Sequence, residues 1–264
     1  MIKYLAIGPG AMGYFIFLGV LSKLKQEGRL EALEEISGAS AGGLAAFLFC
    51  VTKGEPSRAL DFSLNVPVKQ IMKPNIKNLL LNYGLVPHTK IRKVLSGACT
   101  QFLSKIDVTF KELYEWYPVK LHLSSYCVDV GRTVYFSVDT TPTMSVLDAV
   151  CATVAIPFLF TPLKLGDGWN YIDGGSAETI PAAPFLGKPD GVMGIKLAMG
   201  RPVPPKDLKT YGLSILYSTM KLRYDYTDFT ILNVNSDDQD VFDFGASNDG
   251  KLKLFILGHS QKIS

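Results

Sequence analysis

The sequence predicts a fold of the α/β class, and three observations support this prediction. The chain has 264 residues, which is enough for one α/β domain with a sizeable core. Hydrophobic residues make up 47% of the chain and charged residues 19%, a composition that excludes a disordered protein. Short apolar segments with the pattern of buried strands alternate with segments of helical periodicity. No repeat, low-complexity tract or long linker divides the chain, so we expect a single domain over residues 1–264.

The first 51 residues predict two strands, each followed by a helix. Tyr4–Ile7 is a short apolar run that enters a glycine-rich turn, as a buried strand does. Apolar residues then recur at helical spacing over Gly13–Gln26, with charge only at the end of this helix. Glu34–Ile36 predicts a second, short strand, and the small residues 37–43 lead into an apolar helix at Leu44–Val51.

The rest of the chain predicts a helical region and several further strands. The region Glu55–Tyr117 is mainly helical in pattern, with prolines that interrupt it. Gly131 and Arg132 lie between two segments with strand character, so we expect a hairpin there. The other predicted elements are hairpin strands at Val119–Val130 and Thr133–Val138, a helix at Ser145–Val154, a hairpin at Leu163–Ile172, strands at Val192–Ala198 and Phe229–Val234, a helix at Leu208–Leu222, and a helix or strand at Lys251–Leu257.

Charge and cysteine usage exclude several classes of function. The net charge is only +3, and no dense Lys/Arg block indicates a nucleic-acid surface. The four cysteines are scattered in apolar surroundings without the spacing of a metal site or a redox pair, which predicts buried free thiols, no metal and no cofactor. The amino terminus lacks the layout of a secretory signal, and the apolar stretches are too short to span a bilayer. We therefore expect a cytoplasmic protein, with peripheral contact at a membrane surface left open.

Gly38–Gly42 matches the pattern G-x-S-x-G between a predicted strand and an apolar helix. A serine at such a turn has a strained backbone, and bulky neighbours would clash there, which accounts for Gly38 and Gly42 on either side of Ser40. The following helix directs N–H groups and its positive dipole end toward an oxyanion beside the Ser40 hydroxyl. Ser40 is therefore a candidate nucleophile. The alternative is a small-residue helix start that only packs against a neighbouring strand.

Gly8–Gly13 is a second glycine-rich turn, for which two functions are open. As G-x-G-x-x-G after a strand it matches a dinucleotide-binding turn, which needs an acidic residue for the ribose about 20 residues later. Glu34 and Glu35 lie near that distance. As an oxyanion hole, the loop would donate backbone N–H groups, chiefly those of Gly10 and Ala11, because the proline between the first two glycines has none. We favour the oxyanion hole over the nucleotide site and over a purely structural turn.

A nucleophilic serine needs a base to take its proton, and Asp173 is the best candidate. Tyr171–Gly175 places this carboxylate at the end of a predicted strand, before two glycines that let other groups approach it. The histidines fit less well. His88 starts a helix, and His122 lies in an apolar strand. His259 comes late in the chain, as the histidine of an α/β-hydrolase does. That fold has several strands before its nucleophile, whereas here only about one strand and one helix precede Ser40. The alternative for Asp173 is a hairpin turn without chemistry.

In their order along the chain, these three motifs resemble those of the patatin-like phospholipase family. Ala149–Pro162 is similar to the helix-to-proline segment before the family's aspartate, and Cys127–Thr133 is similar to the turn of its central hairpin. The resemblance covers most of the first 200 residues. It implies a three-layer α/β/α fold with a central, mostly parallel sheet. It also implies calcium-independent hydrolysis of acyl esters in membrane lipids, so the expected partner is a lipid or acyl ester substrate.

The resemblance assigns Ser40 as nucleophile, Asp173 as base and the Gly10–Ala11 amides as oxyanion hole. Three departures from the family pattern bear on activity. Pro9 replaces the middle of three glycines, Met12 stands where the family has Lys or Arg, and Val154 stands where a small polar residue is common. Two other functions therefore stay open, a nucleotide-binding oxidoreductase that uses Gly8–Gly13 and a catalytically weak lipid-binding protein on the same scaffold.

Several apolar segments are candidates for an acyl pocket, with the hydrophobic core as their alternative. They are the helical phenylalanines Phe15, Phe17 and Phe47 and the segment Leu79–Val86. Apolar residues at helical spacing line pockets and fill cores alike, so the sequence leaves both interpretations open.

Overall fold

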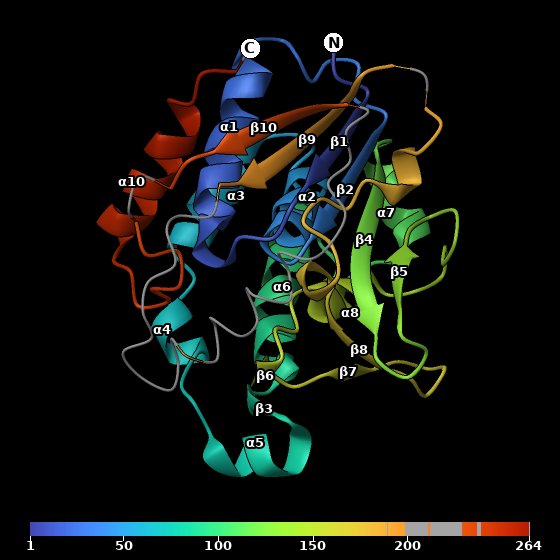
Figure 1. The fold of residues 1–264 in the computed structure, drawn as a ribbon, viewed down its shortest axis with the longest axis vertical. Helices are drawn as coiled ribbons and strands as arrows, with labels where there is room; N and C mark the ends of the chain where they lie inside the picture. The colour runs from blue at the N-terminus through green and yellow to red at the C-terminus, as the bar shows by residue number, and fades with distance from the viewer. Residues whose placement is uncertain (189, 199–210, 212–228, 237–238, 264) are drawn as a thin grey trace.

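The computed structural model describes residues 1–188, 190–198, 211, 229–236 and 239–263. In this part of the chain, helices flank a central sheet, which confirms the predicted α/β class (Figure 1). The first predicted strand forms over the expected residues, as β1 (Tyr4–Ile7). The second begins one residue later than expected and runs through the small residues, as β2 (Glu35–Ala39).

The central sheet has the strand order β10-β9-β1-β2-β4-β8-β7, and β5 pairs with β4 outside this path. The five strands from β10 to β4 are parallel, whereas β5, β8 and β7 join through antiparallel pairs. The sheet is thus mostly parallel, as predicted, with an antiparallel part at one edge where two hairpins reverse the chain. The remaining strands are β4 (Lys120–Cys127), β5 (Arg132–Phe136), β7 (Leu163–Lys164), β8 (Asn170–Asp173), β9 (Val192–Leu197) and β10 (Thr230–Val234).

Helices occupy most of the positions that periodicity predicts. The carboxy-terminal segment is a helix, α10, and the Ser247 side chain caps it by accepting the Gly250 N–H at 3.2 Å. The helix predicted at Leu208–Leu222 lies outside the described residues. Among the helices that the structure describes, none combines the length and apolar character needed to cross a bilayer. Their bounds are α1 (Tyr14–Gln26), α2 (Ala41–Val51), α3 (Pro56–Leu64), α4 (Val68–Ile71), α5 (Ile76–Asn82), α6 (His88–Leu103), α7 (Phe110–Trp116), α8 (Val146–Thr153) and α10 (Asn248–His259).

Both faces of β1 are covered, but by different parts of the chain. Leu5 and Ile7 belong to the main core, which contains the buried residues of α1, α2, α6 and α8. Tyr4 and Ala6 point to the opposite face, because successive residues of a strand alternate, and they pack on the segment Ile180–Phe185. The cysteines are buried and free, as predicted; they are Cys50, Cys99, Cys127 and Cys151.

The predicted helical region Glu55–Tyr117 contains α3 to α7, but it also contains a strand. Gly84–Val86 forms β3, which pairs in parallel with β6 (Phe158–Phe160) outside the central sheet. The helical prediction was wrong at this point because the hydrogen-bond partners of β3 come from a distant segment. Local periodicity carries no information about such a partner.

The carboxy-terminal helix α10 packs along α1 at backbone contact distance. A Cβ atom at Gly258 would lie 2.0 Å from the Ile16 carbonyl oxygen, so no other residue fits at this crossing. His259 follows directly and approaches Gln26 at the end of α1, with 3.1 Å between the ring Nε2 and the amide oxygen. The close crossing ties the last described helix to the first.

Candidate active site

Ser40 lies between β2 and α2, at the carboxyl end of a central parallel strand. Its φ is 55° and its ψ is −123°, a left-handed backbone conformation that is strained for a residue with a side chain. Its N–H donates to the Thr153 hydroxyl at 3.0 Å, and the residue is almost fully buried. The strained strand-to-helix turn expected for a nucleophilic serine is therefore present here.

The two glycine-rich turns lie against each other. A Cβ atom at Gly42 would lie 2.2 Å from the Ile7 carbonyl oxygen and 2.5 Å from that of Gly8. Only glycine permits the first turn of α2 to approach the end of β1 so closely. The turn that contains Ser40 and the glycine loop after β1 are thus adjacent through their backbones.

Asp173 is the last residue of β8 and lies level with Ser40 across β4. Ala39 of β2 pairs with Ser124 of β4, and Ser125 of β4 pairs with Asp173. The two candidate residues therefore flank β4 at neighbouring positions of its register. The N–H of Asp173 donates to the Ala155 carbonyl at 3.0 Å, which ties it to the chain just after α8.

Burial raises the pKa of Asp173 to about 7, because a charged carboxylate is poorly stabilised away from water. Two hydrogen-bonding neighbours oppose this rise in pKa, the Ser40 side chain and the Gly175 N–H, which donates to Oδ1 at 2.7 Å. The second oxygen, Oδ2, is buried and has no partner of regular hydrogen-bond geometry among the described residues. Asp173 is thus a buried carboxyl group close to a serine hydroxyl.

Three N–H groups of the glycine loop donate to backbone carbonyl groups of the described chain, and two others do not. Gly8 donates to a β9 carbonyl at 2.9 Å, Met12 donates to the Val241 carbonyl at 2.8 Å, and Gly13 donates to the Gly10 carbonyl at 2.7 Å. The N–H groups of Gly8 and Gly13, which belong to the predicted oxyanion hole, thus already have backbone acceptors. The N–H groups of Gly10 and Ala11 have no hydrogen bond to a described residue.

Pro9, which interrupts the glycines, packs directly against Gly175. The loop after β1 and the Asp-Gly-Gly turn after β8 are therefore in contact, although they lie far apart in the sequence. This contact places the Gly10 and Ala11 amides, which have no hydrogen bond to a described residue, beside the turn that carries Asp173.

A network of buried polar groups behind Ser40 was not predicted. The Thr153 hydroxyl accepts the Ser40 N–H and donates to the Ser124 carbonyl. The Ser124 hydroxyl donates to Glu178 Oε2 at 2.9 Å, and Tyr135 donates to the same oxygen. Burial raises the pKa of Glu178, and both hydrogen bonds oppose that rise. A sequence signal for this network is the threonine that ends the helix α8, after a run of apolar residues.

A family comparison decides the class of the chain. The Patatin family model, described as patatin-like phospholipase, matches residues 5–186, which is more than half of the chain. The chain belongs to the patatin-like phospholipase family. A relative of this patatin-like chain is the "Probable lipid hydrolase 463L" of Invertebrate iridescent virus 6, with 27% identity over 184 residues. The match covers 68% of this chain and only 61% of the viral protein.

Solved structures share the patatin-like fold at low sequence identity. VipD from Legionella pneumophila superimposes with a TM-score of 0.59 and 15% identity, over 98% of this chain and 66% of VipD. The type III effector ExoU of Pseudomonas aeruginosa gives a TM-score of 0.51 and 16% identity, over 98% of this chain and 51% of ExoU. At these identities the likeness concerns the fold alone.

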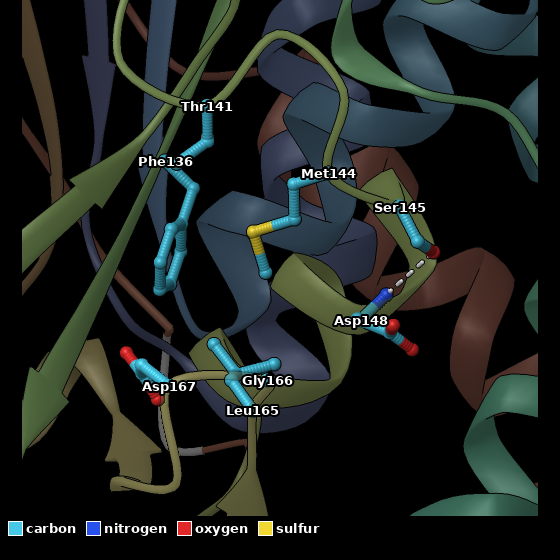
Figure 2. Close-up of a pocket in the computed structure, with 8 residues that line it drawn as sticks. All are labelled: Phe136, Thr141, Met144, Ser145, Asp148, Leu165, Gly166 and Asp167. Carbon is cyan, nitrogen blue, oxygen red and sulfur yellow. Dashed lines mark hydrogen bonds between the residues drawn. The ribbon is translucent and has the colours of Figure 1, made fainter.

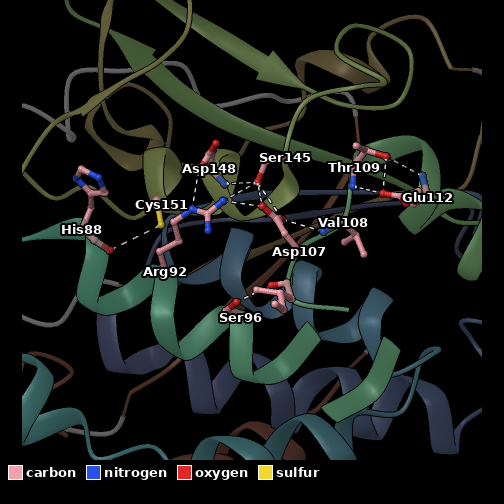
Figure 3. Close-up of polar contacts among 11 residues, drawn as sticks. His88, Arg92, Ser96, Asp107, Val108, Thr109, Glu112, Ser145, Asp148 and Cys151 are labelled. Carbon is pink, nitrogen blue, oxygen red and sulfur yellow. Dashed lines mark hydrogen bonds and ion pairs between the residues drawn. The ribbon is translucent and has the colours of Figure 1, made fainter. Parts of the chain in front are cut away.

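An ion-pair cluster holds the amino-terminal ends of α6 and α8 together in this patatin-like chain (Figure 3). Arg92 Nε donates to Asp148 Oδ1 at 2.8 Å, and a terminal guanidinium nitrogen donates to Asp107 Oδ2 at 2.6 Å. Ser145 joins the cluster, because its hydroxyl donates to Asp107 and accepts the Asp148 N–H at 3.2 Å as the cap of α8. Since α8 carries Thr153, the cluster fixes the helix that holds the Ser40 N–H.

The histidines lie away from Ser40, as expected. His122 is buried and hydrogen-bonded to Glu35 at 2.9 Å. Burial lowers the pKa of His122, and the interaction with Glu35 opposes this decrease. The His88 ring is 2.9 Å from the Thr161 hydroxyl at the start of α6. His259 lies on α10, at the far end of α1 from the glycine loop. No described contact links a histidine ring to Ser40.

The rival nucleotide site is contradicted by the position of its acidic residues. Glu35 pairs with Tyr4 in the sheet register, at the beginning of both strands. The glycine loop follows the opposite ends of these strands, about 10 Å away at the rise of a β-strand. The Glu35 carboxylate is moreover occupied by His122 and by the Lys188 ammonium at 3.0 Å. A ribose bound at the loop would not reach it.

A pocket of about 340 Å³ lies elsewhere, between β5 and the start of α8 (Figure 2). Figure 2 shows the side chains of Phe136 and Met144 facing each other, with Leu165 and Asp167 below them. Neither Ser40 nor Asp173 lines it. The phenylalanines considered for an acyl pocket, Phe15, Phe17 and Phe47, are buried in the main core instead.

Proposed function

We propose that the protein is a lipid acyl ester hydrolase of the phospholipase A or lysophospholipase type, with Ser40 as nucleophile and Asp173 as base. One observation carries this proposal. A buried carboxyl group with a pKa of about 7 has the hydroxyl of a strained turn serine as its hydrogen-bonding neighbour. Such a carboxylate is partly ionised near neutral pH and accepts a proton more readily than an ordinary aspartate.

The reaction would proceed through an acyl-enzyme. Ser40 Oγ attacks the ester carbonyl carbon while Asp173 takes the hydroxyl proton, and the carbonyl oxygen becomes an oxyanion. The N–H groups of Gly10 and Ala11 would stabilise this charge, since donors oriented in advance commonly contribute about 3–4 kcal/mol each. The tetrahedral intermediate collapses, and protonated Asp173 returns the proton to the leaving alcohol or lysolipid. Water then attacks the acyl-enzyme carbonyl while Asp173 takes a proton from it, the bond to Ser40 Oγ breaks, and Asp173 returns the proton to Ser40 as the fatty acid leaves.

The proposal that the substrate is a lipid rests on the similarity of this chain to its family and to its viral relative. The family is described as patatin-like phospholipase, and the viral relative is named a probable lipid hydrolase. Because the chain spans 61% of that relative, its substrate is a proposal here and not a transferred property. The mechanism itself is independent of the head group.

Ser40→Ala should abolish hydrolysis of nitrophenyl acyl esters, with a loss of at least about 1000-fold, because no other described residue can form the acyl-enzyme at this turn. A fluorophosphonate probe should label the natural chain at Ser40 and leave the variant unlabelled. Ser37→Ala is a matched control, because Ser37 is a buried serine of the strand before Ser40 and its hydroxyl has no hydrogen bond to a described residue.

Labelling that persists in Ser40→Ala would overturn the nucleophile assignment. Lipid binding without turnover or labelling in the natural chain would instead favour the catalytically weak binding protein. That outcome would trace to Pro9 and Met12, the two departures in the glycine loop.

A further inference from the structure

A small lobe of residues 66–86, with β6 beside it, projects from the body of the molecule (Figure 1). We call it the α5 lobe, after the helix at its tip. Large apolar side chains stand out from it into solvent, each 65% to 75% exposed; they are Ile76, Leu80, Leu81, Tyr83 and Phe158. An apolar cluster of this kind is unusual on a soluble protein and marks a surface that another phase or molecule covers. The segment Leu79–Val86 is therefore neither a closed acyl pocket nor simply core.

The lobe is held in shape by polar contacts, so its apolar side chains are displayed on a defined frame. The Asn75 side chain caps α5 by accepting the Asn78 N–H at 3.1 Å. Asn78 in turn donates its side-chain amide to the Gly84 carbonyl at 2.6 Å, and the Asn75 N–H donates to the Leu85 carbonyl at 2.9 Å. These bonds tie α5 back onto β3 and leave its leucines outside.

The lobe lies in a cationic part of the chain. Residues 62–106 contain seven Lys and Arg residues and no Asp or Glu. Arg92 is paired with Asp107 and Asp148. Several lysines form no ion pair with a described residue; they are Lys69, Lys73, Lys77 and Lys93. Exposed hydrocarbon beside uncompensated positive charge complements a bilayer that carries anionic phosphate head groups.

The lobe is joined directly to the candidate active site. Phe158 pairs with Gly84 across β3 and β6, and its φ of 66° is a strained value for a bulky residue. Three residues earlier, the Ala155 carbonyl accepts the N–H of Asp173. In Figure 1 the arrowhead of β4 points toward the end of the molecule from which α5 projects. A surface that receives the lobe therefore lies toward the carboxyl ends of the parallel strands, where Ser40 follows β2.

We propose that the α5 lobe docks the protein on an anionic lipid surface, with its apolar side chains in the acyl layer and its lysines at the phosphates. The proposal builds on the hydrolase function proposed above, because docking would present the candidate site to its lipid substrate. Neither a second copy of the chain nor a protein partner accounts for the excess of positive charge beside the apolar cluster as directly.

Vesicle co-sedimentation of the Ser40→Ala protein tests docking apart from catalysis. The protein should bind phosphatidylcholine vesicles with 30 mol% phosphatidylserine, and at least about tenfold more weakly without the anionic lipid. The double variant L80S/L81S should lose at least about tenfold in affinity, and K73E/K77E should lose the preference for phosphatidylserine. Ile256→Ser and Lys111→Glu are matched controls, an exposed isoleucine on α10 and an exposed lysine on α7, and both should bind normally.

Esterase activity, measured in proteins that retain Ser40, distinguishes the docking proposal from the hydrolase proposal. L80S/L81S should hydrolyse a soluble short-chain ester at the natural rate and lipid in anionic vesicles at least about tenfold more slowly. Vesicle binding without any esterase activity would leave the lobe assignment intact and defeat the hydrolase. Unchanged vesicle binding by L80S/L81S, or a dimer that this variant dissociates and that does not bind vesicles, would overturn the docking proposal.

Discussion

Asp173 is a buried carboxyl group whose pKa lies near neutral pH. Its pKa is raised to about 7 chiefly by burial, and the partly compensating hydrogen bonds come from groups that a catalytic base would be expected to contact. Hydrogen bonds that run through Thr153, Ser124 and Glu178 hold the backbone N–H of Ser40 in place. At the scale of single residues, the site thus consists of a strained serine and a desolvated carboxyl group, supported by neighbouring groups that are hydrogen-bonded.

The pH dependence of activity and of stability should run in opposite directions at Asp173. Esterase activity requires the carboxylate, so it should rise as the pH increases through about 7. The folded-state pKa lies above the ordinary value of 3.8, so the folded state binds the proton more tightly. The contribution of this group to stability is therefore most favourable below pH 4 and declines as the pH rises from about 4 to 7.

Asp173→Asn tests both consequences. The variant should lose turnover at every pH while remaining folded, and at pH 8 it should resist denaturant better than the natural chain, by at most about 4 kcal/mol. The gain in unfolding free energy should shrink as the pH is lowered toward 4, where the natural carboxyl group is neutral as well. Equal esterase rates in the two proteins would exclude Asp173 as the base.

At the scale of elements, α8 connects the candidate site to the ion-pair cluster around Arg92. The guanidinium bridges Asp107 and Asp148, and Asp148 lies in the first turn of α8, whose last residue is Thr153. The end that holds Ser40 and the end that holds the cluster are thus one rigid element. The cluster is about one third exposed, so its contribution is moderate and not that of a buried ion pair.

Arg92→Ala should lower the free energy of unfolding by about 1–2 kcal/mol, because two charge-assisted hydrogen bonds are lost. Lys93→Ala is the matched control, since Lys93 is the exposed neighbour on the same helix without an ion pair to a described residue. Urea unfolding of the three proteins measures the difference. A loss in Arg92→Ala no larger than in Lys93→Ala would mean that the cluster does not stabilise the fold.

Prediction of elements from the sequence succeeded where the pattern is local and failed where the partner is distant. The small residues of Glu35–Ala39 extend β2 because the strand is paired on both sides, by β1 and by β4. Without these partners, Ser37-Gly38-Ala39 has little tendency to be extended. β3 was missed for the same reason, since only β6 completes its hydrogen bonds.

At the scale of the whole molecule, α10 packs against α1 and so joins the carboxy-terminal part of the chain to its amino-terminal part. α1 follows the glycine loop directly, so the docking of α10 supports the element on which Gly10 and Ala11 depend. The contact is made by backbone against backbone, because Gly258 lies on Ile16 without a side chain between them.

Gly258→Ala should destabilise the protein by about 2–3 kcal/mol, since the added methyl group meets the Ile16 carbonyl and the helices must separate. Gly97→Ala on α6 is the matched control. A Cβ there meets no atom within 4 Å, so this change should stabilise the helix by about 0.5–1 kcal/mol. Thermal unfolding of the two variants gives the comparison, and equal midpoints would show that the crossing is looser than the structure indicates.

The sequence by itself determined the local parts of this protein. The spacing of apolar residues and the positions of glycines located β1, α1 and the two turns that contain Gly10 and Ser40. Strands, helices and turns of this kind are encoded within a few neighbouring residues. Tertiary structure alone decided which of these parts meet. β4 brings the turn after β2 beside the end of β8, and β6 supports β3 and the lobe at its side. Such pairings depend on hydrogen bonds and desolvation between distant segments, which leave no local signature in the chain.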